Sequence, residues 1–89
     1  MKTAYSKAFE KDFRSLPAGV HMQVLTLVDK VKAAAQLCDM PDCIPLRGSR
    51  SKYRIRCGSY RVIFTLEQDN TVFLHRIVPR GQAYKKHNL

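Results

Sequence analysis

The sequence predicts a small α+β domain in which an N-terminal helical hairpin packs on a twisted antiparallel sheet of about four strands. Three observations lead to this fold class. Apolar residues recur three and four positions apart through the first half of the chain, which is typical of amphipathic helices. They alternate with polar residues through most of the second half, which is typical of strands. A chain of 89 residues suffices for one hydrophobic core, so we expect a single domain over residues 1–89.

The first half opens with a short strand over residues 1–5. Ser6 is expected to cap a first helix through Leu16, because its hydroxyl can accept a hydrogen bond from an amide of the first turn. Pro, Ala and Gly at positions 17–19 interrupt the pattern, and a second helix is expected from about there to Leu37. Each helix has one apolar stripe that needs a partner surface, formed by Phe9, Phe13 and Leu16 in the first and by Val20, Val24, Leu27, Val28 and Val31 in the second.

The second half begins with a proline-containing loop over residues 39–45, and residues 46–48 lead out of it. Alternating apolar residues then predict two strands, from Lys52 to Cys57 and from Tyr60 to Leu66. Between them, Gly58 and Ser59 suit a two-residue type II′ hairpin turn.

This turn decides which side chains share a face of the sheet. If only Gly58 and Ser59 form the loop, Arg56 lies opposite Arg61, and Arg54 lies on the same face. Like charges that face each other across a sheet destabilise it by about a few tenths of a kcal/mol, so we expect an anion to relieve the repulsion. The residues expected on the opposite, core-forming face are Tyr53, Ile55, Cys57, Tyr60, Val62 and Phe64.

A second two-residue turn is expected at Asp69 and Asn70, followed by a strand over residues 71–78 and a tail, 79–89, that forms a turn or a frayed helix. This turn places Arg76 with the other arginines, since a slip of one residue would bury it. We interpret His75 as a satisfied core or edge histidine rather than a catalytic one, although histidine is the commonest acid or base where it is reachable. On the core face, the predicted register places Phe73, His75 and Ile77.

Positive charge is concentrated in the second half of the chain. Sixteen Lys and Arg residues stand against seven Asp and Glu, and of the net charge of +9, residues 1–42 hold +1 and residues 43–89 hold +8. Such a concentration predicts a polyanionic partner, and for a cytoplasmic protein nucleic acid comes first. The alternative is a basic protein that its charge keeps soluble.

The sequence argues against several other classes of protein. Its apolar stretches are short and broken by charges, so no segment is expected to span a membrane, and no secretory signal is expected at the start. The three cysteines, Cys38, Cys43 and Cys57, lack a Cys-x-x-Cys spacing. We therefore expect free thiols in a reducing cytoplasm, and neither a metal site nor another cofactor.

Four short motifs occur together in this chain. They are Phe9-Glu10-Lys11-Asp12-Phe13 in the first predicted helix, Leu46-Arg47-Gly48 before the sheet, the hairpin over residues 53–64, and the closing strand with Arg80-Gly81-Gln82-Ala83-Tyr84. In this order and spacing, they resemble the RelE/ParE superfamily of toxins from bacterial type II toxin-antitoxin systems. The resemblance covers almost the whole chain.

The resemblance implies a helical hairpin on a twisted sheet and an activity in one of two branches. The RelE-like branch, which we favour, consists of metal-independent endoribonucleases that cleave messenger RNA, often on the ribosome, and inhibit translation. The ParE-like branch poisons DNA gyrase. A third alternative is a module that binds nucleic acid without chemistry. The resemblance also implies an acidic antitoxin that assembles with the toxin into a hetero-oligomer, in the cytoplasm of a bacterium or archaeon.

The resemblance also implies roles for individual residues. Arg61, Arg80 and Tyr84 are the implied catalytic residues. Arginine binds phosphate oxygens bidentately and stays charged, which suits Arg61 and Arg80. Tyr84 can stack on a base, exchange a proton or anchor the C-terminus on the sheet. The residues expected to bind RNA are Lys52, Arg54, Arg56, Arg76, Lys85 and Lys86.

The chain departs from the family's pattern at two places. The family often has lysines where this chain has Arg54 and Arg56, and arginine cannot serve as the general base that a lysine of lowered pKa can be. Pro79 replaces the family's common histidine before the signature arginine. Proton transfer would then fall to the RNA and ribosome themselves, or to Tyr84, His75 or His87.

Overall fold

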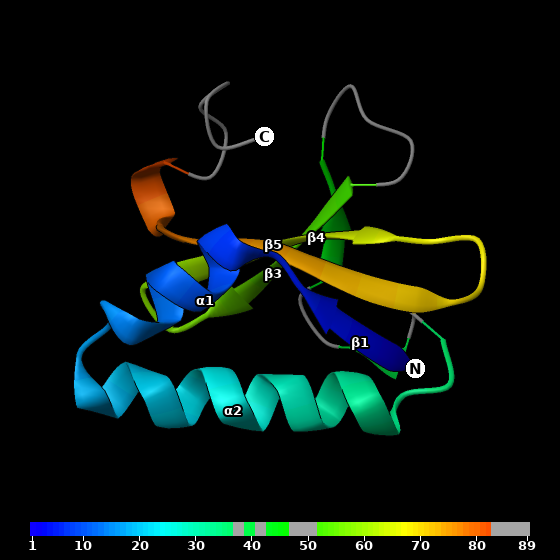
Figure 1. The fold of residues 1–89 in the computed structure, drawn as a ribbon, viewed down its shortest axis with the longest axis horizontal. Coiled ribbons are helices and arrows are strands. Elements are labelled where there is room, and N and C mark those ends of the chain that lie inside the picture. The colour runs from blue at the N-terminus through cyan, green and yellow to red at the C-terminus, as the bar shows by residue number, and fades with distance from the viewer. Residues whose placement is uncertain (37–38, 41–42, 47–51, 83–89) are drawn as a thin grey trace.

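The computed structural model describes residues 1–36, 39–40, 43–46 and 52–82, and in this part of the chain a five-stranded sheet packs with two α-helices (Figure 1). The helices are α1 (Lys7–Arg14) and α2 (Ala18–Ala33), and a short 3-10 helix, η2 (Arg80–Gln82), follows the last strand. The α+β fold class is confirmed. Within the described ranges, no helix is long and apolar enough to cross a membrane. The strands are β1 (Lys2–Tyr5), β2 (Cys43–Pro45), β3 (Lys52–Cys57), β4 (Tyr60–Leu66) and β5 (Thr71–Pro79).

The sheet has the strand order β1-β5-β4-β3-β2 and is mixed, whereas about four antiparallel strands were expected. β1 runs parallel to β5, and the other neighbouring strands are antiparallel. The pattern of residues 1–5 predicts a strand, but its pairing with distant β5 depends on tertiary contacts that the pattern does not contain. β2 lies inside the segment that was expected to be a loop. Its sequence does not predict a strand, because a three-residue edge strand that ends in Pro45 is too short to show periodicity.

Both helices form where the apolar spacing predicts them. Ser6 caps α1 as expected, since its Oγ accepts a hydrogen bond from the amide of Phe9 at 2.9 Å. α2 ends at Ala33, short of the predicted end at residue 37. Beyond it, the carboxylate of Asp39 accepts hydrogen bonds from the amides of Ala35 and Gln36, both at 3.3 Å. These amides are therefore satisfied without a further helical turn.

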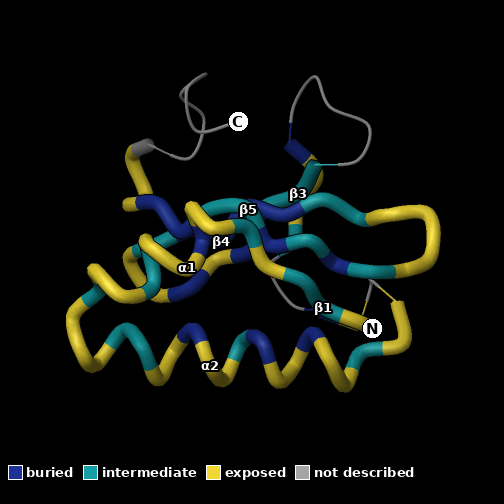
Figure 2. Tube along the Cα trace, in the orientation of Figure 1, coloured by how far each residue is buried: buried dark blue, intermediate teal, exposed yellow. Residues whose placement is uncertain are grey.

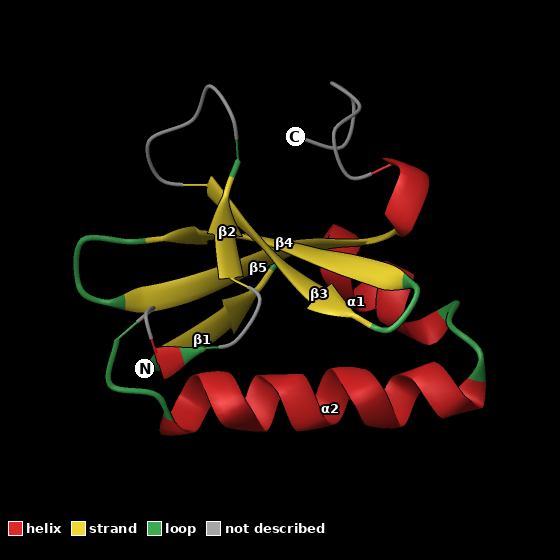
Figure 3. Ribbon diagram, turned by 180° about the vertical axis from the view of Figure 1, so that it is seen from behind, coloured by secondary structure: helices red, strands yellow, loops and turns green. Residues whose placement is uncertain are grey.

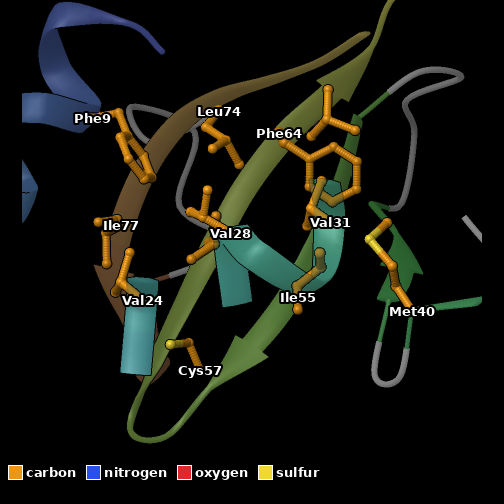
Figure 4. Close-up of a cluster of buried hydrophobic side chains, with 12 residues drawn as sticks. Phe9, Val24, Val28, Val31, Met40, Ile55, Cys57, Phe64, Leu74 and Ile77 are labelled. Carbon is orange, nitrogen blue, oxygen red and sulfur yellow. The ribbon is translucent and has the colours of Figure 1, made fainter. Parts of the chain in front are cut away.

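The main core lies between α2 and one face of the sheet. α2 is buried on the side that faces the sheet and exposed on the other, as Figure 2 shows. The view from behind places α2 along the same side of the sheet (Figure 3). Burial of one large aliphatic side chain stabilises a fold by about 1.5–3 kcal/mol. The side chains buried in this layer therefore contribute most of the hydrophobic stabilisation of the domain. The side chains that meet there include Phe9, Val24, Val28, Val31, Ile55, Cys57, Phe64, Leu74 and Ile77 (Figure 4).

The β3–β4 hairpin has the predicted register. Arg56 lies opposite Arg61, and Ile55 lies opposite Val62. Gly58 has a φ of 59°, which glycine adopts without a steric cost. Among the described residues other than glycine, only Asn70 has a positive φ, so the Gly58-Ser59 turn matches the expected type II′ geometry.

The β4–β5 hairpin departs from the predicted register at two places. Its loop has three residues rather than two, since the amide of Glu67 donates to the carbonyl of Thr71 at 2.8 Å and Asn70 adopts a φ of 68°. Further along, Phe64 pairs with Leu74 while Ile63 pairs with Arg76. This register shift is a β-bulge that leaves His75 as an extra residue in β5.

These two irregularities reverse the predicted orientation of one segment. Between the loop and the bulge, Val72 and Leu74 are buried in the core. Phe73 pairs with Thr65 on the other face, so the prediction that Phe73 and His75 belong to the core is wrong. Beyond the bulge the predicted register returns, and Ile77 is buried in the core as expected.

Candidate nucleic-acid interface

The face of the sheet opposite the main core carries the predicted arginines. Residues that pair across antiparallel strands project to the same side, so the register defines three rows on this face. We call this surface the arginine face. Its rows are Arg56, Arg61 and Val78, then Arg54, Ile63 and Arg76, then Lys52, Thr65 and Phe73.

The arginine face also has a small apolar centre. Leu46, Ile63 and Val78 form a second hydrophobic cluster, and each is at most 2% exposed. Two rows of the arginine face therefore place basic residues next to buried aliphatic ones. Arg54, which is half-buried, lies beside Ile63.

Arg61 is buried and bound to the turn of its own hairpin. Its side chain is 5% exposed, and its Nη1 donates to the carbonyl oxygens of Tyr60 (2.9 Å) and Gly58 (3.2 Å). Backbone oxygens therefore relieve part of the expected repulsion between Arg56 and Arg61. Arg61 fixes the turn and places a positive charge just beneath the surface.

Arg56 and Arg80 lie at the same end of the sheet as Arg61. Arg56 is exposed and directly opposite Arg61. Arg80, also exposed, begins η2, and its amide donates to the carbonyl of Ser59 at 3.0 Å. That hydrogen bond ties the end of β5 to the β3–β4 turn. The fold therefore brings three arginines from separate segments to one turn.

Arg76 interacts with α1. Its Nε donates to Oδ2 of Asp12 at 2.8 Å, and its Nη2 lies 3.3 Å from Oδ1. The hydrogen bond to Asp12 raises the pKa of Arg76 above its ordinary value. The sequence predicts that Arg76 binds RNA. In the structure, its positive charge is compensated by the carboxylate of Asp12.

The third row of the arginine face contains a hydrogen-bonded group that the sequence did not indicate. Thr65 Oγ1 lies 2.9 Å from Nε2 of His75 and 3.1 Å from Oε1 of Glu67, to which it donates. Partial burial, with a smaller contribution from nearby Lys52, lowers the pKa of His75 below its ordinary value, while Glu67 opposes the shift. A three-residue loop shifts the β4–β5 register and so brings these residues onto one face. The residue that could have indicated such a loop is Asn70, because Asn tolerates the left-handed conformation there.

Three of the predicted site residues, Tyr84, Lys85 and Lys86, lie outside the described residues.

The described cysteines are unsuited to nucleophilic attack. Burial raises the pKa of the Cys43 and Cys57 thiols, which keeps them protonated at neutral pH. In the part of the chain that the structure describes, no three His, Cys, Asp or Glu side chains form a group that could hold a metal ion.

Comparisons with known proteins agree on one family. Residues 4–84 match the sequence profile described as the ParE toxin of type II toxin-antitoxin systems, parDE. The chain is also similar to Toxin RelE3 of Methanocaldococcus jannaschii, with 27% identity over 85 residues, which cover 94% of this chain and 96% of that protein.

Solved structures show the same fold. The RelB-RelE antitoxin-toxin complex from Methanococcus jannaschii contains a chain with a TM-score of 0.77 and 23% identity, covering 91% of this chain and 94% of that one. The archaeal RelE-RelB complex from Pyrococcus horikoshii OT3 gives a TM-score of 0.75 and 28% identity, covering 92% and 97%. The profile match spans the fold from β1 to beyond η2.

Proposed function

The chain belongs to the ParE toxin family of type II toxin-antitoxin systems, within the RelE/ParE superfamily, and from its similarity to RelE toxins we propose that it cleaves messenger RNA. In this proposal it is a metal-independent endoribonuclease that acts on the ribosome, in the cytoplasm, and inhibits translation. The observation that carries the proposal is the gathering of Arg56, Arg61 and Arg80 at the β3–β4 turn.

This group of arginines suits phosphoryl transfer. In RNA cleavage without a metal, the 2′-hydroxyl attacks the adjacent phosphorus and the bond to the 5′-oxygen breaks, which leaves a 2′,3′-cyclic phosphate and a 5′-hydroxyl. Negative charge grows on the phosphoryl oxygens, and guanidinium groups stabilise it because they donate in a planar fork and stay charged. The protein's main tasks are to orient the strand and to supply this field.

The three arginines have different roles in the proposal. Arg56 and Arg80 are exposed and contact phosphate oxygens directly. Arg61, at 5% exposure, holds the turn that presents them and adds its charge from beneath. Tyr84, Lys85 and Lys86 retain their predicted roles beside the scissile strand. One proton must leave the 2′-hydroxyl and one must reach the 5′-oxygen, and the RNA, the ribosome, Tyr84 or His87 supply these transfers. His75 is bonded to Thr65, two rows away from Arg61, so it is too far from this phosphate to take part.

We further propose an acidic antitoxin partner. The relatives from M. jannaschii and P. horikoshii form complexes with RelB. Residues 43–89 of this chain carry a net charge of +8, which an extended or helical segment rich in Glu and Asp would neutralise. The antitoxin would cover the arginine face or the helices and hold the toxin in a hetero-oligomer.

Two observations favour a second function, the poisoning of DNA gyrase. The matching profile is that of ParE, and Arg54 and Arg56 stand where the RNA-cleaving branch often has lysines. A gyrase poison would act through protein contact rather than through phosphoryl transfer. The two functions differ in which synthesis stops first.

Pulse expression in a bacterial host separates them. We expect incorporation of labelled methionine to fall before that of labelled thymidine, and mapped RNA 5′ ends to show new cuts within coding regions. Arg56→Ala and Arg80→Ala should reduce both effects. The matched control is Arg14→Ala, which removes the same charge from the exposed end of α1 and should remain toxic.

An early arrest of DNA synthesis without new RNA ends would favour the gyrase alternative. Arrested translation without new ends, with binding that depends steeply on salt, would instead identify a nucleic-acid-binding module without chemistry.

A further inference from the structure

Phe73 and His75 form an aromatic pair on the arginine face. Their ring centroids lie 4.7 Å apart with a 50° tilt, and both side chains are partly exposed. Surfaces that bind single-stranded nucleic acid combine such rings with cations, because bases stack on the rings while the cations follow the backbone. We propose that Phe73 and His75 form a stacking subsite for one base of a single-stranded RNA. This inference rests on the proposed RNA-cleaving function.

Hydrogen bonds fix the orientation of the His75 ring. The Thr65 hydroxyl has a single proton, which it donates to Oε1 of Glu67, so Nε2 of His75 must carry the proton of the 2.9 Å bond to Thr65. The neutral ring then has its lone pair on Nδ1. A ring held in this way offers a defined face to a base and loses little further freedom on binding.

The electrostatic setting favours a neutral ring on a basic surface. Burial and Lys52 lower the pKa of His75, and the opposing influence of Glu67 is smaller, so the ring is mainly uncharged at neutral pH. Lys52 pairs with Thr65 in the same row, and Arg54 lies in the next row. The subsite thus places an apolar surface for a base beside cations for its phosphates.

The spacing along the strands links this subsite to the arginines at the β3–β4 turn. Residues on one face of a strand repeat about every 6.6 Å, so the row of Thr65 lies about 13 Å from the row of Arg61. A few nucleotides of one extended strand span this distance. One RNA strand can therefore occupy both places.

The test is a double-mutant cycle between the protein and a short single-stranded oligoribonucleotide at low salt. A single abasic nucleotide is moved along the oligomer, and its effect on affinity is measured for the wild type and for Phe73→Leu, which keeps an apolar side chain without a ring. We expect Phe73→Leu to weaken binding by about tenfold. At one position of the oligomer, the abasic nucleotide should weaken binding to the wild type by the same factor as Phe73→Leu does. At that position it should not weaken binding to Phe73→Leu any further.

Three variants serve as controls. Phe73→Tyr keeps the ring and should retain affinity. Phe13→Leu removes a ring from α1 and should also retain it. The slope of affinity against salt should be unchanged in Phe73→Leu and reduced by about one in Arg56→Ala, because only the second removes a phosphate contact. Thermal melts verify that each variant is folded.

The outcomes separate the two proposals. Wild-type binding that survives Phe73→Leu unchanged, or full additivity at every abasic position, overturns the subsite and leaves the RNA-facing role of the arginines in place. If the wild type does not bind the oligomer even at low salt, both the RNA-facing assignment and the subsite fail.

Discussion

The carboxylate of Asp12 in α1 accepts a 2.8 Å hydrogen bond from Nε of Arg76 in β5. The same carboxylate oxygen accepts the amide of Ile77 at 2.9 Å, just beyond the stretch of β5 that β1 pairs with. Asp12 therefore accepts a backbone amide of β5 beyond the end of β1, where no strand in the described part of the chain pairs with that edge. α1 is held on β5 by this carboxylate as well as by the buried ring of Phe9. An acidic residue in the first predicted helix thus reduces the positive field at one arginine of the sheet.

Replacing Asp12 by Ala should lower the free energy of unfolding by about 1–3 kcal/mol, because it removes charge-assisted hydrogen bonds at a partly buried edge. Asp12→Asn keeps an oxygen acceptor for the Ile77 amide and should cost less. Glu10→Ala, an exposed acidic residue of the same helix, should change stability by less than about 0.5 kcal/mol. Urea denaturation measures all three, and equal stability of Asp12→Ala and Glu10→Ala would contradict the edge-capping role.

Arg61→Ala should destabilise the fold while Arg56→Ala should not. Arg61 is buried and donates to Gly58 and Tyr60, so its loss leaves backbone oxygens without these donors and should cost about 2 kcal/mol or more. Arg56 is exposed and faces a like charge, so Arg56→Ala should stay within about 0.5 kcal/mol of the wild type. Chemical denaturation of both variants provides the comparison.

Toxicity of the same two variants distinguishes positioning from direct contact. If Arg61→Ala were as stable as the wild type yet inactive, the activity would depend on the charge of Arg61 rather than on its hold on the turn, and the positioning role proposed here would be wrong.

The sequence predicts those parts of the fold that local signals determine. Gly58 and Ser59 determine the β3–β4 register because a two-residue loop permits only one pairing, and Ser6 marks the start of α1. The β4–β5 register depends on a three-residue loop and a later bulge, which compensate each other, so Ile77 is placed correctly and Phe73 is not. The parallel pairing of β1 with β5 is a tertiary choice that alternation cannot reveal.

For the candidate site, the sequence predicts which arginines share a face but not how each is used. Alternation places Arg56 and Arg61 together, yet one is exposed and the other buried. That difference arises from hydrogen bonds to the turn, which residue type alone does not specify. The pairing of Arg76 with Asp12 joins segments far apart in the chain, and no local pattern of residues indicates it.

The pKa of His75 should respond in opposite directions to its two charged neighbours. It lies below the ordinary value because burial and Lys52 disfavour the charged ring, while Glu67 favours it. Lys52→Met should therefore raise the pKa, and Glu67→Gln should lower it further. Titration of the histidine side-chain signals by NMR measures both shifts, and movement of both variants in one direction would contradict this account.

The same pKa determines how stability changes with pH. Since the folded-state pKa lies below the unfolded value of about 6.5, the unfolded chain takes up a proton first as the solution is acidified. Stability should therefore fall as the pH drops below about 6.5, until the folded state is protonated too. His75→Gln should remove this component of the slope, which denaturation at a series of pH values would show.

Gly58→Ala should lower the free energy of unfolding by about 1–2 kcal/mol, because an L-residue pays that amount at the φ of 59° that this turn requires. A Cβ there would also lie 2.5 Å from Oε1 of Gln23 in α2, but this flexible side chain can move aside. The cost should therefore persist when Gln23→Ala is introduced first, because it arises from the backbone conformation of the type II′ turn. Urea denaturation of the single and double variants measures these terms. If Gln23→Ala removed the cost, crowding by α2 rather than backbone conformation would be the reason for glycine at the turn that holds Arg56, Arg61 and Arg80 together.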